Sequence, residues 1–110
     1  GDTLKLFCLD ILKDASKLET YDIVVASGVF NFKLENQDQH EYIFQMLSKM
    51  YSMARIGISV DFMTTHVDWK EENTFYMEPG KLFKFGKNLS QKVILRSDYL
   101  PFEQCIYIMR

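Results

Sequence analysis

Polar and small residues suited to ligand contact follow the clearest strand pattern in the sequence. The apolar, mostly β-branched run Ile23–Ala26 is followed directly by Ser27-Gly28-Val29-Phe30-Asn31. Glycine lets backbone approach a ligand closely, because it has no Cβ and tolerates unusual dihedral angles. Phe30 would supply an aromatic wall, and Asn31 an amide that both donates and accepts hydrogen bonds. A plain strand-to-helix turn has the same composition, so spacing alone leaves both interpretations open.

Two further apolar runs end in an acidic residue. The run Leu4–Leu9 ends at Asp10-Ile11, and the run Arg55–Val60 ends at Asp61-Phe62-Met63. In open α/β sheets, ligands bind beyond the carboxyl ends of the strands. We therefore expect any ligand site to lie where these strand ends meet.

Other site chemistries find little support in the sequence. His40 and His66 are far apart, and neither has a cysteine or carboxylate at metal-ligand spacing, so we expect no metal. Ser27-Gly28 lacks the preceding Gly-x of a nucleophile elbow, which argues against a serine hydrolase. The sequence therefore assigns no catalytic residue.

The elements that must position the strand ends alternate between strand and helix patterns. A helix is predicted from about Gln39 to Ala54, because apolar residues recur along one face. These residues are Ile43, Met46, Leu47, Met50 and Ala54, and we interpret the methionines as core packing. A strand follows over Arg55–Met63, and its Gly57 suggests close packing of a neighbouring helix. The polar stretch from Thr64 is predicted to be a loop.

The C-terminal part predicts one more helix and a hairpin. Pro79-Gly80 is well placed to open a helix, since proline is favoured in the first helical turn. Lys92–Arg96 and Gln104–Met109 read as strands, joined by the connector Ser97–Glu103. That connector is too short for a helical crossover, so the two strands should pair antiparallel and add an antiparallel strand at one sheet edge. The predicted fold class is α/β, a partial doubly wound, mostly parallel sheet with a C-terminal antiparallel hairpin, in one domain over residues 1–110.

Composition excludes several classes of partner. The chain has 110 residues, 47% of them hydrophobic, and a net charge of −2 without any block of like charge. This is a poor footprint for nucleic acid, and no apolar run is long enough to span a bilayer, so neither is expected as a partner. Cys8 and Cys105 lie inside apolar segments and read as reduced, buried thiols, which favours a cytoplasmic location.

The chain resembles class I S-adenosylmethionine-dependent methyltransferases in several segments. Tyr21–Asn31 looks like the fourth strand of that family, and Leu6–Ile11 resembles its third strand. The helix around Tyr42–Met53 and the strand Gly57–Phe62 fit the units that follow in the family, and Asp98–Ile108 is similar to its terminal hairpin. The resemblance covers nearly the whole chain and implies S-adenosylmethionine as the cofactor.

The resemblance also implies roles for individual residues. Those implied for the cofactor are Asp10 and Ile11 beside the adenine and Ser27, Gly28 and Val29 on the adenosyl or methionyl side. Those implied for the acceptor are Phe30, Asn31 and Tyr76. A small-molecule acceptor is expected, since the residues after the fourth strand differ from those of amino-methylating branches. His66 lies in the insert Thr64–Glu78, where it either assists proton removal or is an ordinary exposed loop histidine.

Two parts of the family pattern are absent from the sequence. The glycine-rich loop after the family's first strand and the acidic residue ending its second strand have no counterpart here. The chain thus resembles the part from the third strand to the C-terminus, as a fragment, a split half or a degenerate relative. We expect it to be inactive alone and to need either its missing N-terminal half or a second copy. The alternative is a non-catalytic α/β interaction domain that pairs through exposed sheet edges.

Overall fold

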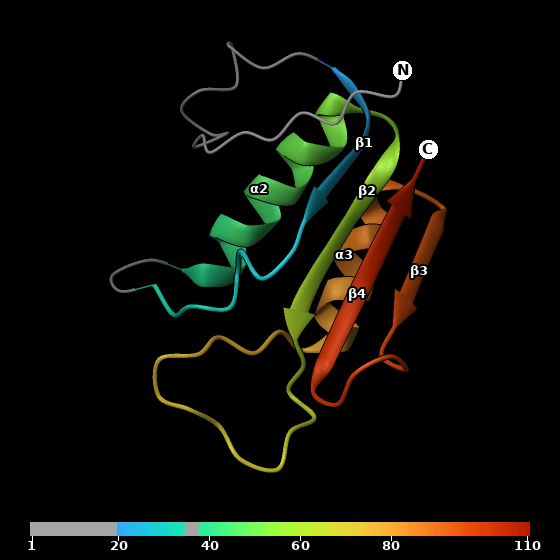
Figure 1. Ribbon diagram of the computed structural model, residues 1–110. Helices are drawn as coiled ribbons and strands as arrows, with labels where there is room; N and C mark the ends of the chain where they lie inside the picture. The colour runs from blue at the N-terminus through green and yellow to red at the C-terminus, as the bar shows by residue number, and fades with distance from the viewer. Residues whose placement is uncertain (1–19, 35–37) are drawn as a thin grey trace.

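The computed structural model describes residues 20–34 and 38–110, and these form a four-stranded sheet with two helices (Figure 1). The elements are β1 (Tyr21–Ala26), α2 (Gln39–Met53), β2 (Ala54–Met63), α3 (Pro79–Leu89), β3 (Lys92–Arg96) and β4 (Glu103–Met109). The elements expected from the Ile23–Ala26 run onward are therefore confirmed. The predicted first strand, with Asp10, Ile11 and Cys8, lies outside the described residues.

The sheet order is β1-β2-β4-β3, with β1 parallel to β2 and β4 antiparallel to both of its neighbours. The C-terminal hairpin is confirmed, but the expectation that its antiparallel strand lies at a sheet edge is wrong. β4 lies inside the sheet, and β3 forms the edge. The side chains explain this order, because β4 buries Cys105, Ile106 and Ile108, whereas β3 begins and ends with exposed Lys92 and Arg96. Charged residues on an edge strand discourage pairing with another chain.

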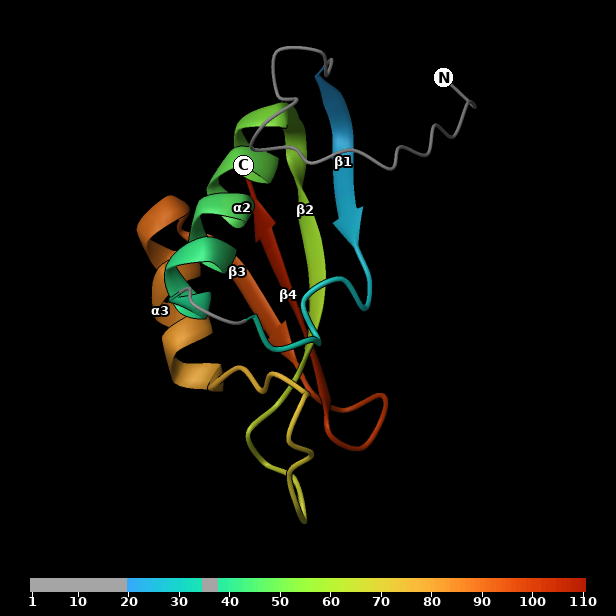
Figure 2. The same cartoon turned by 90° about the vertical axis from the view of Figure 1, so that its left-hand side faces the viewer.

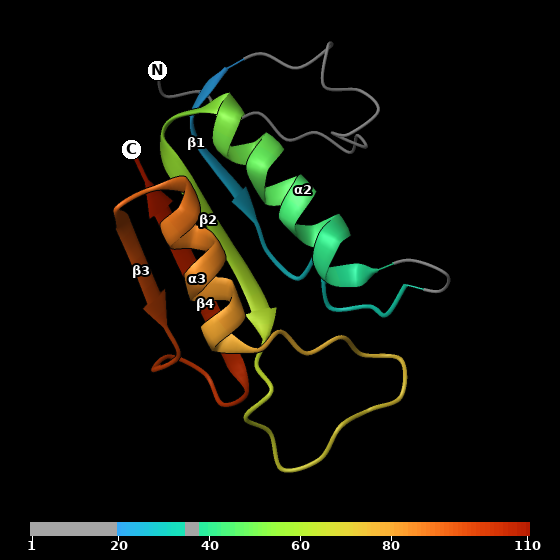
Figure 3. The same cartoon turned by 180° about the vertical axis from the view of Figure 1, so that it is seen from behind.

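Both described helices cover the same face of the sheet (Figures 2 and 3). The residues buried between the layers include Ile43 and Leu47 of α2, Leu82 of α3, Ile58 and Val60 of β2, and Ile106 and Ile108 of β4. The opposite face has no helix over it within the described residues. Ile23 and Val25 of β1 and Ile94 of β3 are 54%, 65% and 56% exposed there. We call this the open face; it shows that the described part holds one helical layer of a doubly wound fold.

Helix α2 begins at a polar cap and buries its methionines as predicted. The Asp38 side chain accepts a hydrogen bond from the Glu41 backbone N–H at 3.2 Å, which satisfies one unpaired donor of the first turn. Met46 and Met50 are 9% and 3% exposed and pack in the core. Thioether side chains adapt to the irregular surface of a twisted sheet, which explains their use on this face.

Gly57 of β2 marks a close approach, but the neighbour is a strand and not the expected helix. A Cβ at this position would lie 2.6 Å from Met109 Sδ and 2.7 Å from the Ile108 carbonyl oxygen of β4. The Gly57–Met109 pair is directly opposed in the antiparallel ladder. The two backbones therefore meet more closely than any residue with a side chain would allow.

Helix α3 begins at Pro79 behind an acidic cap. The Glu78 carboxylate accepts hydrogen bonds from the backbone N–H groups of Gly80 at 3.0 Å and Lys81 at 2.7 Å. These backbone hydrogen bonds hold the pKa of Glu78 below its ordinary value of 4.5. The folded state thus favours the ionised carboxylate more than the unfolded state does.

Glu78→Gln is expected to flatten the acid limb of the stability profile. Because the folded pKa is lowered, the contribution of Glu78 is present above the ordinary value of 4.5 and is lost as pH falls through the folded pKa. Urea unfolding of both proteins between neutral pH and the acid range measures the difference. The two curves should converge as the pH drops below about 4.5, and a constant gap over the whole range would contradict the assignment.

Two further findings concern the described residues. None of the helices in this part of the chain is long and apolar enough to cross a membrane. Cys105 is a free, buried thiol, as the sequence predicts for it.

Candidate active site

The turn after β1, residues Ser27–Val29, is held by a carboxylate from the neighbouring strand. Asp61 Oδ2 accepts a hydrogen bond from Ser27 Oγ at 2.7 Å, and Asp61 Oδ1 accepts one from the Gly28 backbone N–H at 2.6 Å. Hydrogen bonds to an ionised carboxylate are shorter and stronger than neutral ones. We call Ser27–Val29, fixed in this way by Asp61, the β1 turn.

The parallel register explains why Asp61 reaches this turn. Val25 pairs with Ser59 and Ala26 with Val60, so the next positions along the strands, Ser27 and Asp61, lie opposite each other at the carboxyl edge. Gly28 has a φ of +69°, a left-handed conformation that side chains disfavour. Apart from its chain neighbours, no atom of residues 20–34 and 38–110 lies within 4 Å of where its Cβ would be, so the described part of the chain leaves the space beside this glycine open. A ligand can therefore approach the backbone of the β1 turn.

Phe30 lies in the core and not on the surface of the site. It is 4% exposed, and its ring stacks on Phe62 with centroids 5.6 Å apart. Val29, in contrast, is 56% exposed. The ring of Phe30 thus supports the β1 turn from beneath, while little of its surface is left for an acceptor.

Asn31 carries a buried polar atom that lacks a hydrogen-bond partner among the described residues. Its side-chain oxygen Oδ1 is buried without a hydrogen-bond partner among the described residues, whereas its backbone carbonyl accepts from Phe75 N–H at 3.0 Å. A buried acceptor without a partner costs free energy, on the order of 1–3 kcal/mol, unless a water or a ligand donates to it. An N–H or O–H donor of a ligand would remove this cost.

Tyr76 sits in the loop that pairs with the Asn31 segment. Its phenol oxygen accepts a hydrogen bond from the Glu71 backbone N–H at 2.9 Å, and Lys70 Nζ lies 5.7 Å from its ring centroid. His66, in the same loop, is exposed. Tyr76 is half-buried and already bonded within the loop, so the structure gives it a clear loop-building role.

Three loops join at the carboxyl edge of the sheet (Figure 1). The β1–α2 loop and the β2–α3 loop are tied by Lys33 N–H donating to the Asn73 carbonyl at 3.0 Å, in addition to the bond at Asn31. The β3–β4 loop joins them where Thr64 N–H donates to the Phe102 carbonyl at 2.9 Å. We call residues 27–34, 64–78 and 97–102 together the rim.

Tyr99 lies in the β3–β4 loop of the rim. Partial burial, followed by the charges of Cys105, Glu103 and Asp61, raises the pKa of Tyr99 to about 12. The phenol therefore stays neutral at physiological pH.

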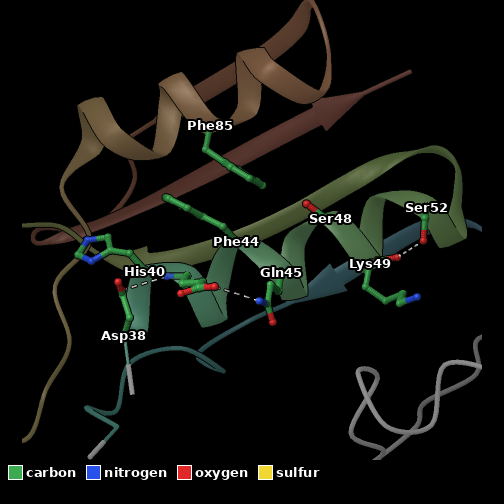
Figure 4. Close-up of a pocket in the computed structure, with 9 residues that line it drawn as sticks. Asp38, His40, Phe44, Gln45, Ser48, Lys49, Ser52 and Phe85 are labelled. Carbon is green, nitrogen blue, oxygen red and sulfur yellow. Dashed lines mark hydrogen bonds between the residues drawn. The ribbon is translucent and has the colours of Figure 1, made fainter. Parts of the chain in front are cut away.

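A separate open groove of about 810 Å³ runs between α2 and α3, on the helical face (Figure 4). At its floor Phe44 and Phe85 stack with ring centroids 4.3 Å apart, and His40 packs edge-on against Phe75 at 5.2 Å. The groove is lined mainly by the outward side of α2 and includes neither the β1 turn nor Asp61. Size alone does not make it the site, because it lacks a strand carboxyl end.

The structure brings some of the predicted site residues together and adds one. Ser27 and Gly28 meet in the β1 turn, Asn31 adjoins the loop that carries Tyr76, and Phe30 packs beneath. Asp61 was recognised in the sequence only as a strand end, although a lone acidic residue closing a β-branched strand was the available signal. Within the residues that the structure describes, no group of three or more His, Cys, Asp or Glu side chains could hold a metal ion.

Comparisons with known proteins point to methyltransferases. The chain is 30% identical over 94 residues to "Putative methyltransferase Rv1506c" of Mycobacterium tuberculosis, covering 81% of this chain and 57% of that protein. No protein-family model matches the chain. In structure it is similar to the magnesium protoporphyrin IX methyltransferase of Synechocystis PCC 6803, solved with bound SAH, with a TM-score of 0.61 and 12% sequence identity.

That structural match covers 84% of this chain and 46% of the Synechocystis chain. The chain thus spans about half the length of each protein that it resembles. At this identity the structural likeness shows the fold. The resemblance to methyltransferases and the α/β fold class expected from the sequence are both confirmed.

Proposed function

We propose that this chain, whose fold is similar to that of a methyltransferase, is the C-terminal portion of a longer class I enzyme that transfers a methyl group from S-adenosylmethionine to a small molecule. The observation that carries the proposal is the β1 turn, held open by Asp61 at the carboxyl edge of this sheet. Edges of this kind are where open α/β sheets bind ligands. The sequence likeness to a protein named as a methyltransferase supports the same reaction class.

The residues present fit one side of the cofactor. The exposed β1 turn would hold the adenosyl or methionyl side of the cofactor. The buried Asn31 Oδ1, which has no partner among the described residues, would accept a hydrogen bond from an N–H or O–H group of the bound molecule. Asp10 and Ile11, outside the described residues, stay predicted as adenine contacts. When bound, S-adenosylmethionine supplies a methyl group already activated by a sulfonium charge.

The part played by this chain would be binding, orientation and exclusion of water. Asp61 fixes the β1 turn, so that its backbone is ordered before a ligand arrives. Holding two reactants in line removes much of the entropic part of a reaction barrier. Asn31 and Tyr76 are proposed acceptor contacts, and Phe30 acts through packing against Phe62. We propose no strong base among the described residues.

The open face supports the proposal that this chain packs against another part of a longer protein and does not form a domain by itself. Ile23 and Val25 at one edge of the sheet and Ile94 at the other are more than half exposed on this face, and in a doubly wound fold helices cover both faces of the sheet. The chain spans 57% of the length of its Mycobacterium relative. We assign this face to the remaining part of the longer protein, which would also carry the glycine-rich loop that this sequence lacks.

Titration calorimetry of the longer protein with S-adenosylmethionine and S-adenosylhomocysteine tests the proposal. We expect dissociation constants on the order of micromolar, weakened at least about tenfold by Asp10→Ala, and weak or no binding by the 110-residue chain alone. Asp14→Ala is the matched control, since it removes a nearby carboxylate that the proposal does not use. A folded longer protein that binds neither compound would favour the non-catalytic interaction domain instead.

A further inference from the structure

Exposed apolar side chains are concentrated on the rim. Of the 12 large hydrophobic residues that are exposed in the described part of the chain, seven lie in the rim loops. Each loop contributes, with Phe32 at 72%, Trp69 at 69% and Leu100 at 54% exposed. Hydrophobic side chains scattered singly over a surface need no explanation, but a group at one end of a fold often marks a binding site.

Backbone hydrogen bonds connect the three loops of the rim. Backbone bonds of 3.0 Å at Lys33–Asn73 and 2.9 Å at Thr64–Phe102 join the loops that carry Phe32, Trp69 and Leu100. Phe32 itself forms an isolated antiparallel bridge with Thr74. The apolar side chains are therefore held on a connected backbone, next to the β1 turn with which the β1–α2 loop begins.

The charge of the rim is one-sided. The long loop 64–78 contains four carboxylates (Asp68, Glu71, Glu72 and Glu78) and a single lysine, Lys70. The other two loops add Asp98 and Lys33, so the rim as a whole has five carboxylates and two lysines. Lys70 lies over the ring of Tyr76. Like charges placed close together are disfavoured, so the long loop repels anions and accommodates neutral or cationic ligands.

We propose that the rim binds the methyl acceptor, and that this acceptor is a neutral or cationic small molecule with an extended apolar body. This inference rests on the proposed function, because only a methyltransferase has a methyl acceptor. It deepens that function by naming the substrate class. The apolar side chains select the body of the ligand, and the carboxylates exclude anionic relatives. The β1 turn lies in the same edge, so the bound molecule would lie beside the methyl donor.

Trp69 provides a local probe, since it is the single tryptophan of the chain and belongs to the rim. Its fluorescence is isolated by subtracting the signal of the Trp69→Phe variant from that of the intact protein. The probes are decyltrimethylammonium, decyl maltoside and decyl sulfate, all below their micelle concentrations, with tetramethylammonium as the head-group control. We expect the emission of Trp69 to shift to the blue with decyltrimethylammonium and decyl maltoside. Decyl sulfate should bind at least about tenfold more weakly, and tetramethylammonium should not bind.

Single-residue variants test whether the rim binds these probes. Phe32→Ser and Leu100→Ser should each weaken binding of decyltrimethylammonium about tenfold, while Phe83→Ser, an exposed phenylalanine on α3, should leave it unchanged. The double variant Glu71→Gln with Glu72→Gln should reduce the difference in affinity between decyltrimethylammonium and decyl sulfate. Equal binding of both probes by the unaltered protein, no binding at all, or an equal loss in Phe83→Ser would overturn the inference. Since no S-adenosylmethionine is used, this outcome is independent of the calorimetric test of methyl transfer.

Discussion

Asp61→Ala is expected to weaken binding of S-adenosylmethionine by the longer protein at least about tenfold, or about 1.4 kcal/mol. The substitution removes both hydrogen bonds that hold the β1 turn, at 2.7 Å to Ser27 and 2.6 Å to Gly28. A hydrogen bond to a charged group contributes about 1.5–3 kcal/mol, and we take the lower part of that range because Asp61 is only half-buried. Titration calorimetry measures the loss, and the amide proton of Gly28 should move upfield in NMR spectra as the bond disappears.

Controls separate positioning of the turn from general damage. Asp61→Asn keeps an oxygen that can accept from Gly28 N–H, so it should bind S-adenosylmethionine better than Asp61→Ala. Asp22→Ala removes an exposed carboxylate at the other end of β1, where it pairs with Arg55 at 2.8 Å, and should leave the affinity unchanged. Equal affinities of Asp61→Ala and the unaltered protein, with the Gly28 amide shifted, would show that the turn is not part of the cofactor site.

Gly57→Ala is expected to lower the free energy of unfolding by about 1–3 kcal/mol or more. The added methyl group would meet the Ile108 carbonyl oxygen at 2.7 Å and Met109 Cα at 3.0 Å. Both are backbone atoms of β4, so relief requires the two strands to separate and not merely a side chain to rotate. Urea denaturation followed by circular dichroism measures the change.

Ser59→Ala is the matched control for this substitution. Ser59 lies two residues further along β2 on the same face, and its hydroxyl makes only a 3.4 Å contact with the Cys105 sulfur. It should change stability by less than about 1 kcal/mol. If Gly57→Ala were as stable as Ser59→Ala, the close approach of β2 and β4 would not be a constraint on this position.

The sequence was informative where local patterns decide the structure. The helical spacing of Ile43, Leu47 and Met50 predicts α2, and the β-branched run closed by Ser27-Gly28 predicts β1 and its turn. These signals depend on periodicity within one element, and burial against a single sheet face enforces them. The resemblance to methyltransferases used the same segments.

Pairing between distant segments was not predictable in the same way. Asp61 reaches Ser27 only because Ala26 pairs with Val60, and a shift of the register by one residue would turn the carboxylate to the other face. Likewise, the short connector predicts a hairpin without saying which of its strands joins the rest of the sheet. The charged ends of β3 and the apolar run of β4 were the available signal. The contact between Phe32 and Thr74 joins two loops with no regular pattern. The burial of Asn31 Oδ1 without a hydrogen-bond partner among the described residues was not predictable either, because it depends on how several loops pack at the carboxyl edge of the sheet.

The interior position of β4 has a consequence for the order in which the chain can fold. Among the described helices and strands, β4 is synthesised last, and it pairs on one side with β2 and on the other with β3. Until it emerges, the sheet lacks the strand that joins β3 to β2, and the core lacks Ile106 and Ile108. Formation of contacts distant in sequence is slow, and unpaired strands are prone to aggregate in the meantime. The described part of the fold is therefore expected to be completed only after β4 has emerged, and the earlier stage with unpaired strands is the one most exposed to aggregation.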